Sequence, residues 1–193
     1  MLNSAEDGGS GREARALWRR IDTPGHDAAR LVRSEAGHVL MGTAVFRHSD
    51  GPACIDYTVT VDEEWKTTDG EIYGFVGDRT IRHQVKRRPS GWSLDGRHQR
   101  GLDHLVDLDL GFTPATNLLQ LSRAAVAIGA AAEFDVAWFD IGMEMLAVLP
   151  QCYRRDDATT YQYAAPSVPY EATLEMAPNG FVKTYPGLWA MES

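Results

Sequence analysis

The stretch CIDYTVTVD, Cys54 to Asp62, decides the fold that the sequence predicts. Its apolar residues occupy every second position and alternate with Asp and Thr, which is the period of a β-strand with one buried and one wet face. An amphipathic helix would instead repeat its apolar positions every three to four residues. The stretch therefore predicts a half-buried strand.

Runs of this kind recur along the chain at roughly the 8–12-residue spacing of an all-β meander. Gly, Asn and Asp pairs such as Asp50-Gly51 separate them and tolerate the positive φ of tight hairpins. Besides residues 54–62, strands are expected at 29–32, 38–47, 71–76, 80–87, 104–110, 133–139, 144–154, 160–164, 170–176 and 181–185. We expect a mostly β protein built on a single rolled or spiral antiparallel sheet, half-barrel-like, of roughly a dozen strands.

One segment, TPATNLLQLSRAAVAI at residues 113–128, departs from this rhythm. Thr113 is a candidate N-cap for a helix that begins at Pro114. Leu118, Leu119 and Leu121 would then point to one side of that helix. We expect one short helix near residues 114–122.

The length of 193 residues and a hydrophobic content of 44% fit one domain with a sizeable core. Residues 1–15 carry Gly, Ser and charges without an apolar run, so we expect a disordered tail there and a single β-roll domain over residues 16–193. No window approaches the ~18 consecutive apolar residues of a spanning helix. We expect a cytoplasmic protein with no integral membrane segment, present as a monomer or a homodimer.

Composition and motifs argue against several functions. A formal charge of −8, from 19 basic and 27 acidic residues, is not that of a nucleic-acid binder. The two cysteines and six histidines show no metal-ligand spacing. Nucleophile-elbow, P-loop and dinucleotide-binding motifs are missing. We therefore expect no metal, no cofactor and no catalytic residue, and favour a protein that is not an enzyme.

The stretch VDLDLGFTPATN, residues 106–117, places two carboxylates inside an apolar alternation. On a strand Asp107 and Asp109 would share a face at a spacing of ~6.5 Å. Three interpretations remain open. The side chains fix the turn beside Thr113, Thr116 and Asn117 by hydrogen bonds, which we favour; they contact a ligand; or they act as the paired carboxylates of a hydrolase.

Aromatic residues are dense in the last quarter of the chain. Tyr and Trp combine an apolar ring with a polar tip, which suits both a sheet core and the wall of a pocket for an amphiphile. The residues are Tyr153, Tyr161, Tyr163, Tyr170, Phe181, Tyr185 and Trp189.

Motifs spread over most of the chain resemble the bacterial family known as "Putative glycolipid-binding", formerly a domain of unknown function. They are LWRRIDTPGHDAARL from Leu17, YTVTVDEEW ending at Trp65, WSLDGR from Trp92, the 106–117 stretch and FVKTYPGLW ending at Trp189. The resemblance implies a spiral antiparallel sheet with a short helical element, and a glycolipid ligand without catalytic residues. The motif positions that it marks as ligand-binding candidates are Trp65, Asp95, Asp107, Asp109, Thr113, Asn117, Tyr185 and Trp189.

The leading hypothesis is a non-catalytic binding protein that holds an apolar or amphiphilic ligand, such as a glycolipid, in a groove of a curved β-sheet. Apolar burial would supply most of the affinity. One alternative is a hydrolase of a glycosidic or ester bond that uses Asp107 and Asp109. The other is a structural or interaction module without a small-molecule ligand, which would bind through a sheet edge or a homodimer face.

Overall fold

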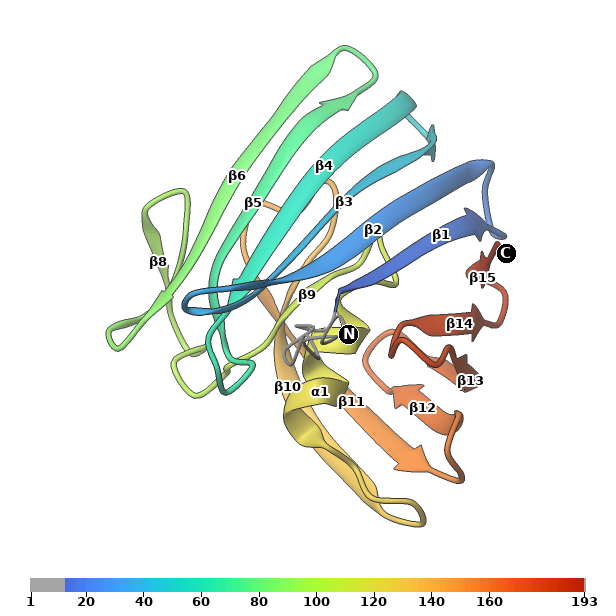
Figure 1. Cartoon of the computed structure of the whole chain (residues 1–193). Coiled ribbons are helices and arrows are strands. Elements are labelled where there is room, and N and C mark those ends of the chain that lie inside the picture. Colours follow the sequence, from blue (N-terminus) through green and yellow to red (C-terminus); the bar gives the residue numbers. More distant parts are fainter. Residues whose placement is uncertain (1–12, 193) are drawn as a thin grey trace, which may run out of the picture.

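The computed structural model describes residues 13–192, which form one continuous curled sheet with a short helix inside the curl (Figure 1). Within these residues the sheet has 15 strands. They are β1 Ala14–Arg20, β2 Gly25–Ser34, β3 Gly37–His48, β4 Gly51–Val61, β5 Thr67–Val76, β6 Arg79–Arg88, β7 Gly91–Leu94, β8 Arg97–Gln99, β9 Leu108–Leu110, β10 Ala131–Phe139, β11 Ala147–Arg155, β12 Thr160–Ala165, β13 Tyr170–Met176, β14 Val182–Tyr185 and β15 Trp189–Met191.

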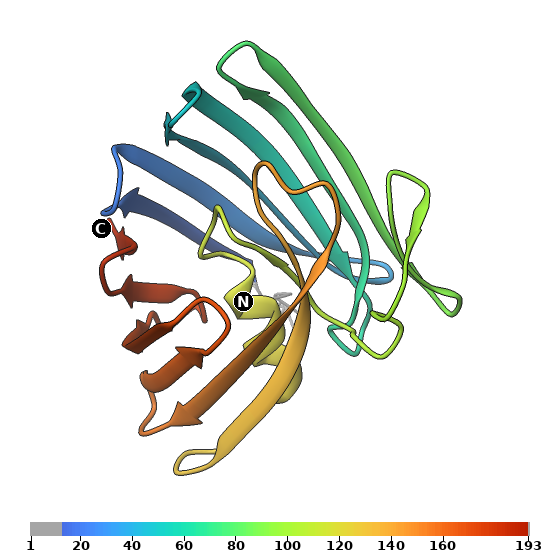
Figure 2. The same cartoon turned by 180° about the vertical axis from the view of Figure 1, so that it is seen from behind.

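The strand order is β8-β7-β6-β5-β4-β3-β2-β1-β15-β14-β13-β12-β11-β10-β9. Two meanders, β1 to β8 and β10 to β15, therefore join where the first strand meets the last. All pairs are antiparallel except β9 and β10, which run parallel. The predicted mostly β fold with one curled sheet is confirmed, and the sheet is not closed on itself (Figure 2).

The seam between the two meanders is the pairing of β1 with β15, in which Trp18 lies opposite Met191. Trp18 is fully buried, and its indole Nε1 donates to the carbonyl oxygen of Val182 at 2.7 Å. The ring of Phe181 packs edge-on against it, with 5.2 Å between the ring centroids. Residues more than 160 positions apart in the chain thus form one packed joint.

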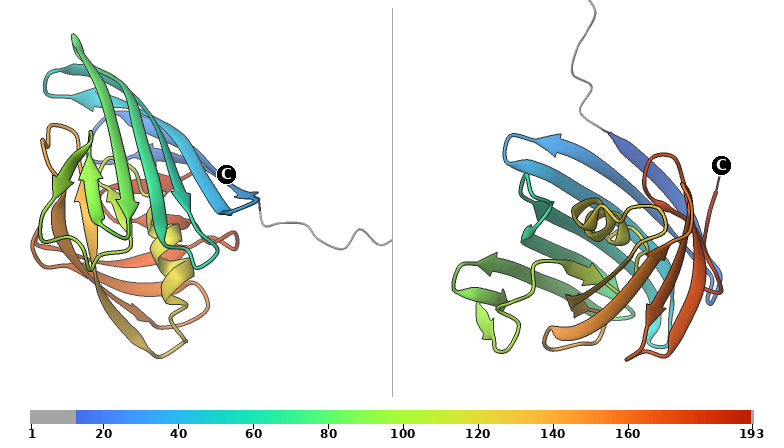
Figure 3. Two further views of the ribbon diagram at one scale, coloured as in Figure 1. Left: turned by 90° about the vertical axis from the view of Figure 1, so that its left-hand side faces the viewer. Right: turned by 90° about the horizontal axis from the view of Figure 1, so that it is seen from below.

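Helix α1, Asn117–Ala124, lies on the concave side of the sheet (Figure 3). Its buried residues are Asn117 to Leu121. The helix was expected near residues 114–122 with Thr113 as its N-cap, but it begins three residues later. The N-cap position is Thr116 rather than Thr113, and the Thr116 hydroxyl donates to Asp109 instead of capping the helix.

Other boundaries differ from those expected. Residues 1–12 of the predicted tail and Ser193 lie outside the described residues, and β1 begins at Ala14, before the predicted domain start at residue 16. The run 104–110 is a strand only from Leu108 onwards. The short strands β7, β8 and β15 and strand β1 were not predicted. Among residues 13–192, no helix combines the length and apolar character needed to cross a membrane.

We predict that Trp18→Phe weakens the seam and lowers the free energy of unfolding by about 1–2 kcal/mol, because a buried carbonyl loses its donor. Chemical denaturation measures this loss. Trp65→Phe is the control, since Trp65 is only half-buried and sits in a turn away from the seam. Equal losses in the two variants would contradict the role given to the Trp18 hydrogen bond.

Candidate functional site

The segment from Asp107 to Asn117 passes through the interior of the curled sheet, where its polar groups bond to both meanders. On one side, Thr67 of β5 donates its backbone N–H to the Val106 carbonyl, and its hydroxyl accepts from the Leu108 N–H at 3.0 Å. On the other side, the Gly111 N–H donates to the carbonyl of Phe139 at 2.9 Å. The segment is therefore fixed before α1 begins.

Asp109 is buried, and both of its oxygens accept hydrogen bonds from neighbouring side chains. The Thr116 hydroxyl donates to Oδ1 at 2.6 Å, and Gln151 Nε2 donates to Oδ2 at 2.7 Å. Burial raises the pKa of this carboxyl above its ordinary value, and the nearby negative charge of Asp140 adds to the rise. The predicted hydrogen bond between an Asp of the stretch and Thr116 is present. Both Asp107 and Asp109 are buried.

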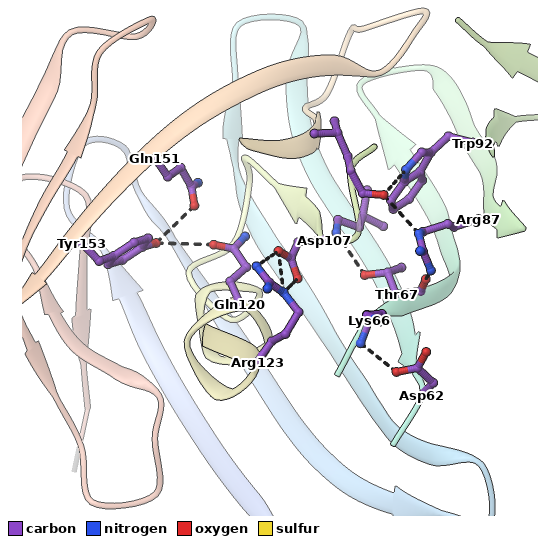
Figure 4. A network of polar contacts seen from close by, with 12 residues as sticks. Asp62, Lys66, Thr67, Arg87, Trp92, Asp107, Gln120, Arg123, Gln151 and Tyr153 are labelled. Atoms are coloured by element: carbon purple, nitrogen blue, oxygen red, sulfur yellow. Dashed lines mark hydrogen bonds and ion pairs between the residues drawn. The ribbon is translucent and has the colours of Figure 1, made fainter. Parts of the chain in front are cut away.

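Asp107 faces α1 rather than its sequence neighbour Asp109. Arg123 binds its carboxylate with two nitrogens, Nη2 at 2.6 Å from Oδ2 and Nε at 2.9 Å from Oδ1 (Figure 4). Burial raises the pKa of Asp107, and the charges of Arg123 and Arg87 oppose this rise. The contact joins the start of the segment to the last turn of the helix.

Helix α1 is also tied to the second meander through Tyr153 of β11. Asn117 Nδ2 donates to the Tyr153 hydroxyl at 2.7 Å. That hydroxyl lies 3.4 Å from Gln120 Oε1 and 3.3 Å from Gln151 Oε1. Figure 4 draws both contacts. Asn117 and Gln120 thus fix the first turns of the helix against the concave face.

A third buried carboxyl, Asp27 of β2, was missed by the sequence analysis. It accepts hydrogen bonds from the hydroxyls of Thr113 and Tyr57, the latter at 3.0 Å. Burial raises its pKa from 3.8 to about 7. The predicted strand began at Ala29; extending the alternation of Ala29 and Leu31 back by two residues would have placed Asp27 on the core side.

A pocket of about 260 Å³ opens beside this segment on the concave side of the second meander. Its lining is mainly apolar and aromatic, with a few polar groups. The apolar and aromatic residues are Leu110, Pro114, Trp138, Leu149, Tyr163, Ala165, Val168, Tyr170, Tyr185, Leu188 and Trp189. The others are Asp109, Gly111, Thr113, Asn117 and Asp140.

The pocket brings together five of the eight candidate residues, namely Asp109, Thr113, Asn117, Tyr185 and Trp189. These come from three separate places: strand β9, the turn before α1 together with the first residue of the helix, and the last two strands. The aromatic residues from the last quarter of the chain therefore supply one wall of the pocket, and the 106–117 stretch supplies the facing wall.

Three candidates lie outside this pocket. Asp107 is paired with Arg123. Trp65 stacks on the His38 ring with 4.0 Å between centroids. Asp95 fixes a tight turn, since its Oδ1 accepts from the Gln84 N–H at 2.7 Å and its Oδ2 lies 2.8 Å from His83 Nδ1.

Several pocket residues had no role in the sequence analysis. Tyr163 and Tyr170 were noted only as members of the aromatic cluster, whereas Trp138, Asp140 and Gly111 were not singled out. Burial raises the pKa of Tyr170 to about 12 and that of Tyr163 further, so both keep their hydroxyl protons at neutral pH. No group of three or more potential ligands for a metal ion occurs within residues 13–192.

A curled antiparallel sheet that encloses one helix and a small aromatic-lined pocket defines the structural class of the protein. The family model described as "Putative glycolipid-binding" matches residues 15–191. The chain therefore belongs to this family.

A solved structure has the same fold. It is the crystal structure, at 1.80 Å resolution, of a DUF1089 family protein from Pseudomonas aeruginosa, with 21% sequence identity and a TM-score of 0.66. The alignment covers 98% of this chain and 97% of that one. No curated protein matches the chain.

We predict that Arg123→Met lowers the free energy of unfolding by about 2–3 kcal/mol, because it leaves the buried Asp107 carboxyl without its ion-pair partner. Adding Asp107→Asn should recover part of this loss. Denaturant unfolding of both single variants and the double variant measures the coupling. A loss below about 0.5 kcal/mol for Arg123→Met would contradict a structural role for the pair.

We predict that Asp27 makes stability fall as pH rises from about 4 to about 7. Over this range the folded protein keeps a proton that the unfolded chain has released, so each pH unit costs up to ~1.4 kcal/mol. Above about pH 7 the effect is complete. Asp27→Asn should remove this part of the slope, whereas Asp56→Asn, at an exposed strand position, should not. Parallel stability-versus-pH curves for wild type and Asp27→Asn would refute the assignment.

Proposed function

We propose that the protein is a non-catalytic binding protein that takes up an amphiphilic ligand, such as a glycolipid, in the pocket beside residues 109–117. The proposal rests on the residues that line the pocket. Aromatic and aliphatic side chains surround a small number of polar groups, which is the usual make-up of a small-molecule site. Membership of a family named for glycolipid binding supports the same class of ligand.

Apolar contact would supply most of the affinity. Val168 and Leu188 contribute aliphatic surface, and the rings of Tyr170 and Trp189 contribute aromatic surface. Burying such surface is worth ~25 cal/mol per Å², before the cost of ordering the ligand. The volume of about 260 Å³ is below the ~300–1,000 Å³ typical of sites for drug-sized molecules. The pocket therefore suits one part of an amphiphile rather than the whole molecule.

The geometry does not favour a hydrolase built on Asp107 and Asp109. Paired carboxylates that cleave a glycosidic bond face each other across the substrate. Here Asp107 is bound by Arg123 outside the pocket, and both oxygens of Asp109 are occupied by Thr116 and Gln151. The two carboxyls serve two different structural contacts.

A larger depression of about 540 Å³ lies over β10 to β13. Its rim carries exposed charged residues, including Glu133, Arg154 and Glu171. Its lining has two aromatic residues, Tyr153 and Tyr163, against five in the smaller pocket, and it includes no buried carboxyl. We therefore assign ligand binding to the smaller pocket.

The proposal is tested by native mass spectrometry of the protein purified gently from its own cells, followed by solvent extraction of anything bound. We expect about one equivalent of an amphiphile on the wild-type protein. A clean apo mass for the wild type, with no lipid in the extract, would contradict the proposal.

We predict that Val168→Glu abolishes this occupancy, because it places a charge at the pocket without disturbing the core. Val148→Glu is the matched control: Val168 is 41% exposed and Val148 40% exposed, but only Val168 lines the pocket. The control should keep its ligand. Equal occupancy in the two variants would place the ligand elsewhere on the molecule.

A further inference from the structure

The polar end of the pocket holds a hydrogen-bond donor and an acceptor close together. Trp138 is the penultimate residue of β10, and Asp140 follows the strand directly. Trp138 Nε1 lies 2.8 Å, and Asp140 Oδ2 2.7 Å, from the point that a Cβ atom on Gly111 would occupy. The absence of a side chain at Gly111 therefore leaves room for both groups at the pocket.

These two atoms have no hydrogen-bond partner among residues 13–192, although the polar groups around them do. The other Asp140 oxygen, Oδ1, accepts from the Ile141 N–H at 2.7 Å. Asp109 is satisfied by Thr116 and Gln151. The buried side-chain atoms without partners in the described residues are His38 Nδ1 and Gln120 Nε2, so Trp138 Nε1 and Asp140 Oδ2 are not sealed from solvent.

A donor beside an acceptor matches a hydroxyl group, which donates one hydrogen bond and accepts others. A phosphate or carboxylate only accepts, so it would satisfy Trp138 but be repelled by Asp140. An ammonium group only donates, so it would leave the Trp138 N–H unmatched. The pair therefore favours a neutral hydroxyl over either kind of ion.

The charges around the pocket disfavour an anionic ligand. Two carboxyl residues, Asp109 and Asp140, line it, and none of its described lining residues is Lys, Arg or His. Arg20 and His48 are the basic residues whose charges act on Asp140. The guanidinium of Arg20 is bound by both oxygens of Asp22, at 2.8 and 3.0 Å, so its charge is already paired.

The aromatic walls provide the complementary surface. Tyr163, Tyr170 and Tyr185 form a cluster in which neighbouring ring centroids lie 5.4 to 6.1 Å apart. Such rings offer an apolar face on which the C–H face of a sugar ring can pack. A pocket of about 260 Å³ has room for one such ring.

We propose that the pocket binds its ligand head first, through a single neutral sugar ring with a hydroxyl between Trp138 Nε1 and Asp140 Oδ2, and that it rejects anionic head groups. This inference rests on the proposed function, because it specifies the ligand of the same pocket. The alkyl part of the ligand would then lie toward Val168, which is the exposed apolar residue of the lining.

The test is isothermal titration calorimetry with four probes that share one alkyl chain, each kept below its micelle concentration. They are octyl β-glucoside, octyl β-galactoside, octyl phosphate and octylammonium. We expect at least one glycoside to bind tenfold or more tightly than either ion. The variants Gly111→Ala and Trp138→Phe, checked for folding by circular dichroism, should each weaken that binding at least fivefold. Trp65→Phe, outside the pocket, should not.

The outcomes separate this inference from the proposed function. If the ions bind as tightly as the glycosides, or if Gly111→Ala and Trp138→Phe leave glycoside binding unchanged, head-first sugar recognition is wrong while amphiphile binding stands. If no probe binds to the wild type, and the protein purified from its own cells carries no lipid, both fail. If no probe binds but an anionic lipid co-purifies, the inference fails alone.

Discussion

The fold depends on one constraint. A chain segment runs through the inside of the curled sheet, and its polar groups must all be hydrogen-bonded there. Buried N–H, C=O and carboxyl groups are costly unless they are hydrogen-bonded. The segment from Asp107 to Asn117 meets this requirement by bonding to both meanders, with Thr113 joined to Asp27 in β2 and Asp109 joined to Gln151 in β11. These contacts determine where α1 begins and hold the two halves of the sheet at a fixed separation.

The pocket follows from the same arrangement. Because the segment and α1 fill only part of the concave side, a space remains between the turn at Gly111 to Asn117 and the aromatic residues of β12 to β15. The carboxyls and hydroxyls that fix the turn leave the ligand few free polar groups. Trp138 Nε1 and Asp140 Oδ2 are free because Gly111 has no side chain to cover them. One set of polar contacts thus stabilises the fold, and a smaller set remains for recognition.

The class of fold was predictable because alternation with a period of two, as in residues 54–62, is a local property of the chain. The five candidates that converge in the pocket came from family motifs. Local periodicity did not predict the burial of Asp107 and Asp109, because the partners Arg123, Thr116 and Gln151 come from other elements. The contacts of Asp27 and Tyr57 with Thr113 could not be predicted for the same reason, because they span 86 and 56 residues. Trp138 and Asp140 become a pair only once Gly111 is placed beside them.

The most direct measurement is the ¹H–¹⁵N spectrum of the five tryptophan indole groups during titration with the octyl glycoside that binds best. If the ligand occupies this pocket, the Trp138 signal shifts most. The signals of Trp18 and Trp92 should stay, since their N–H groups donate to the carbonyls of Val182 and Leu105, and that of Trp65 should stay because it is remote from the pocket. A saturating titration that leaves Trp138 unmoved, or that shifts Trp65 instead, would contradict the assignment of this pocket as the ligand site.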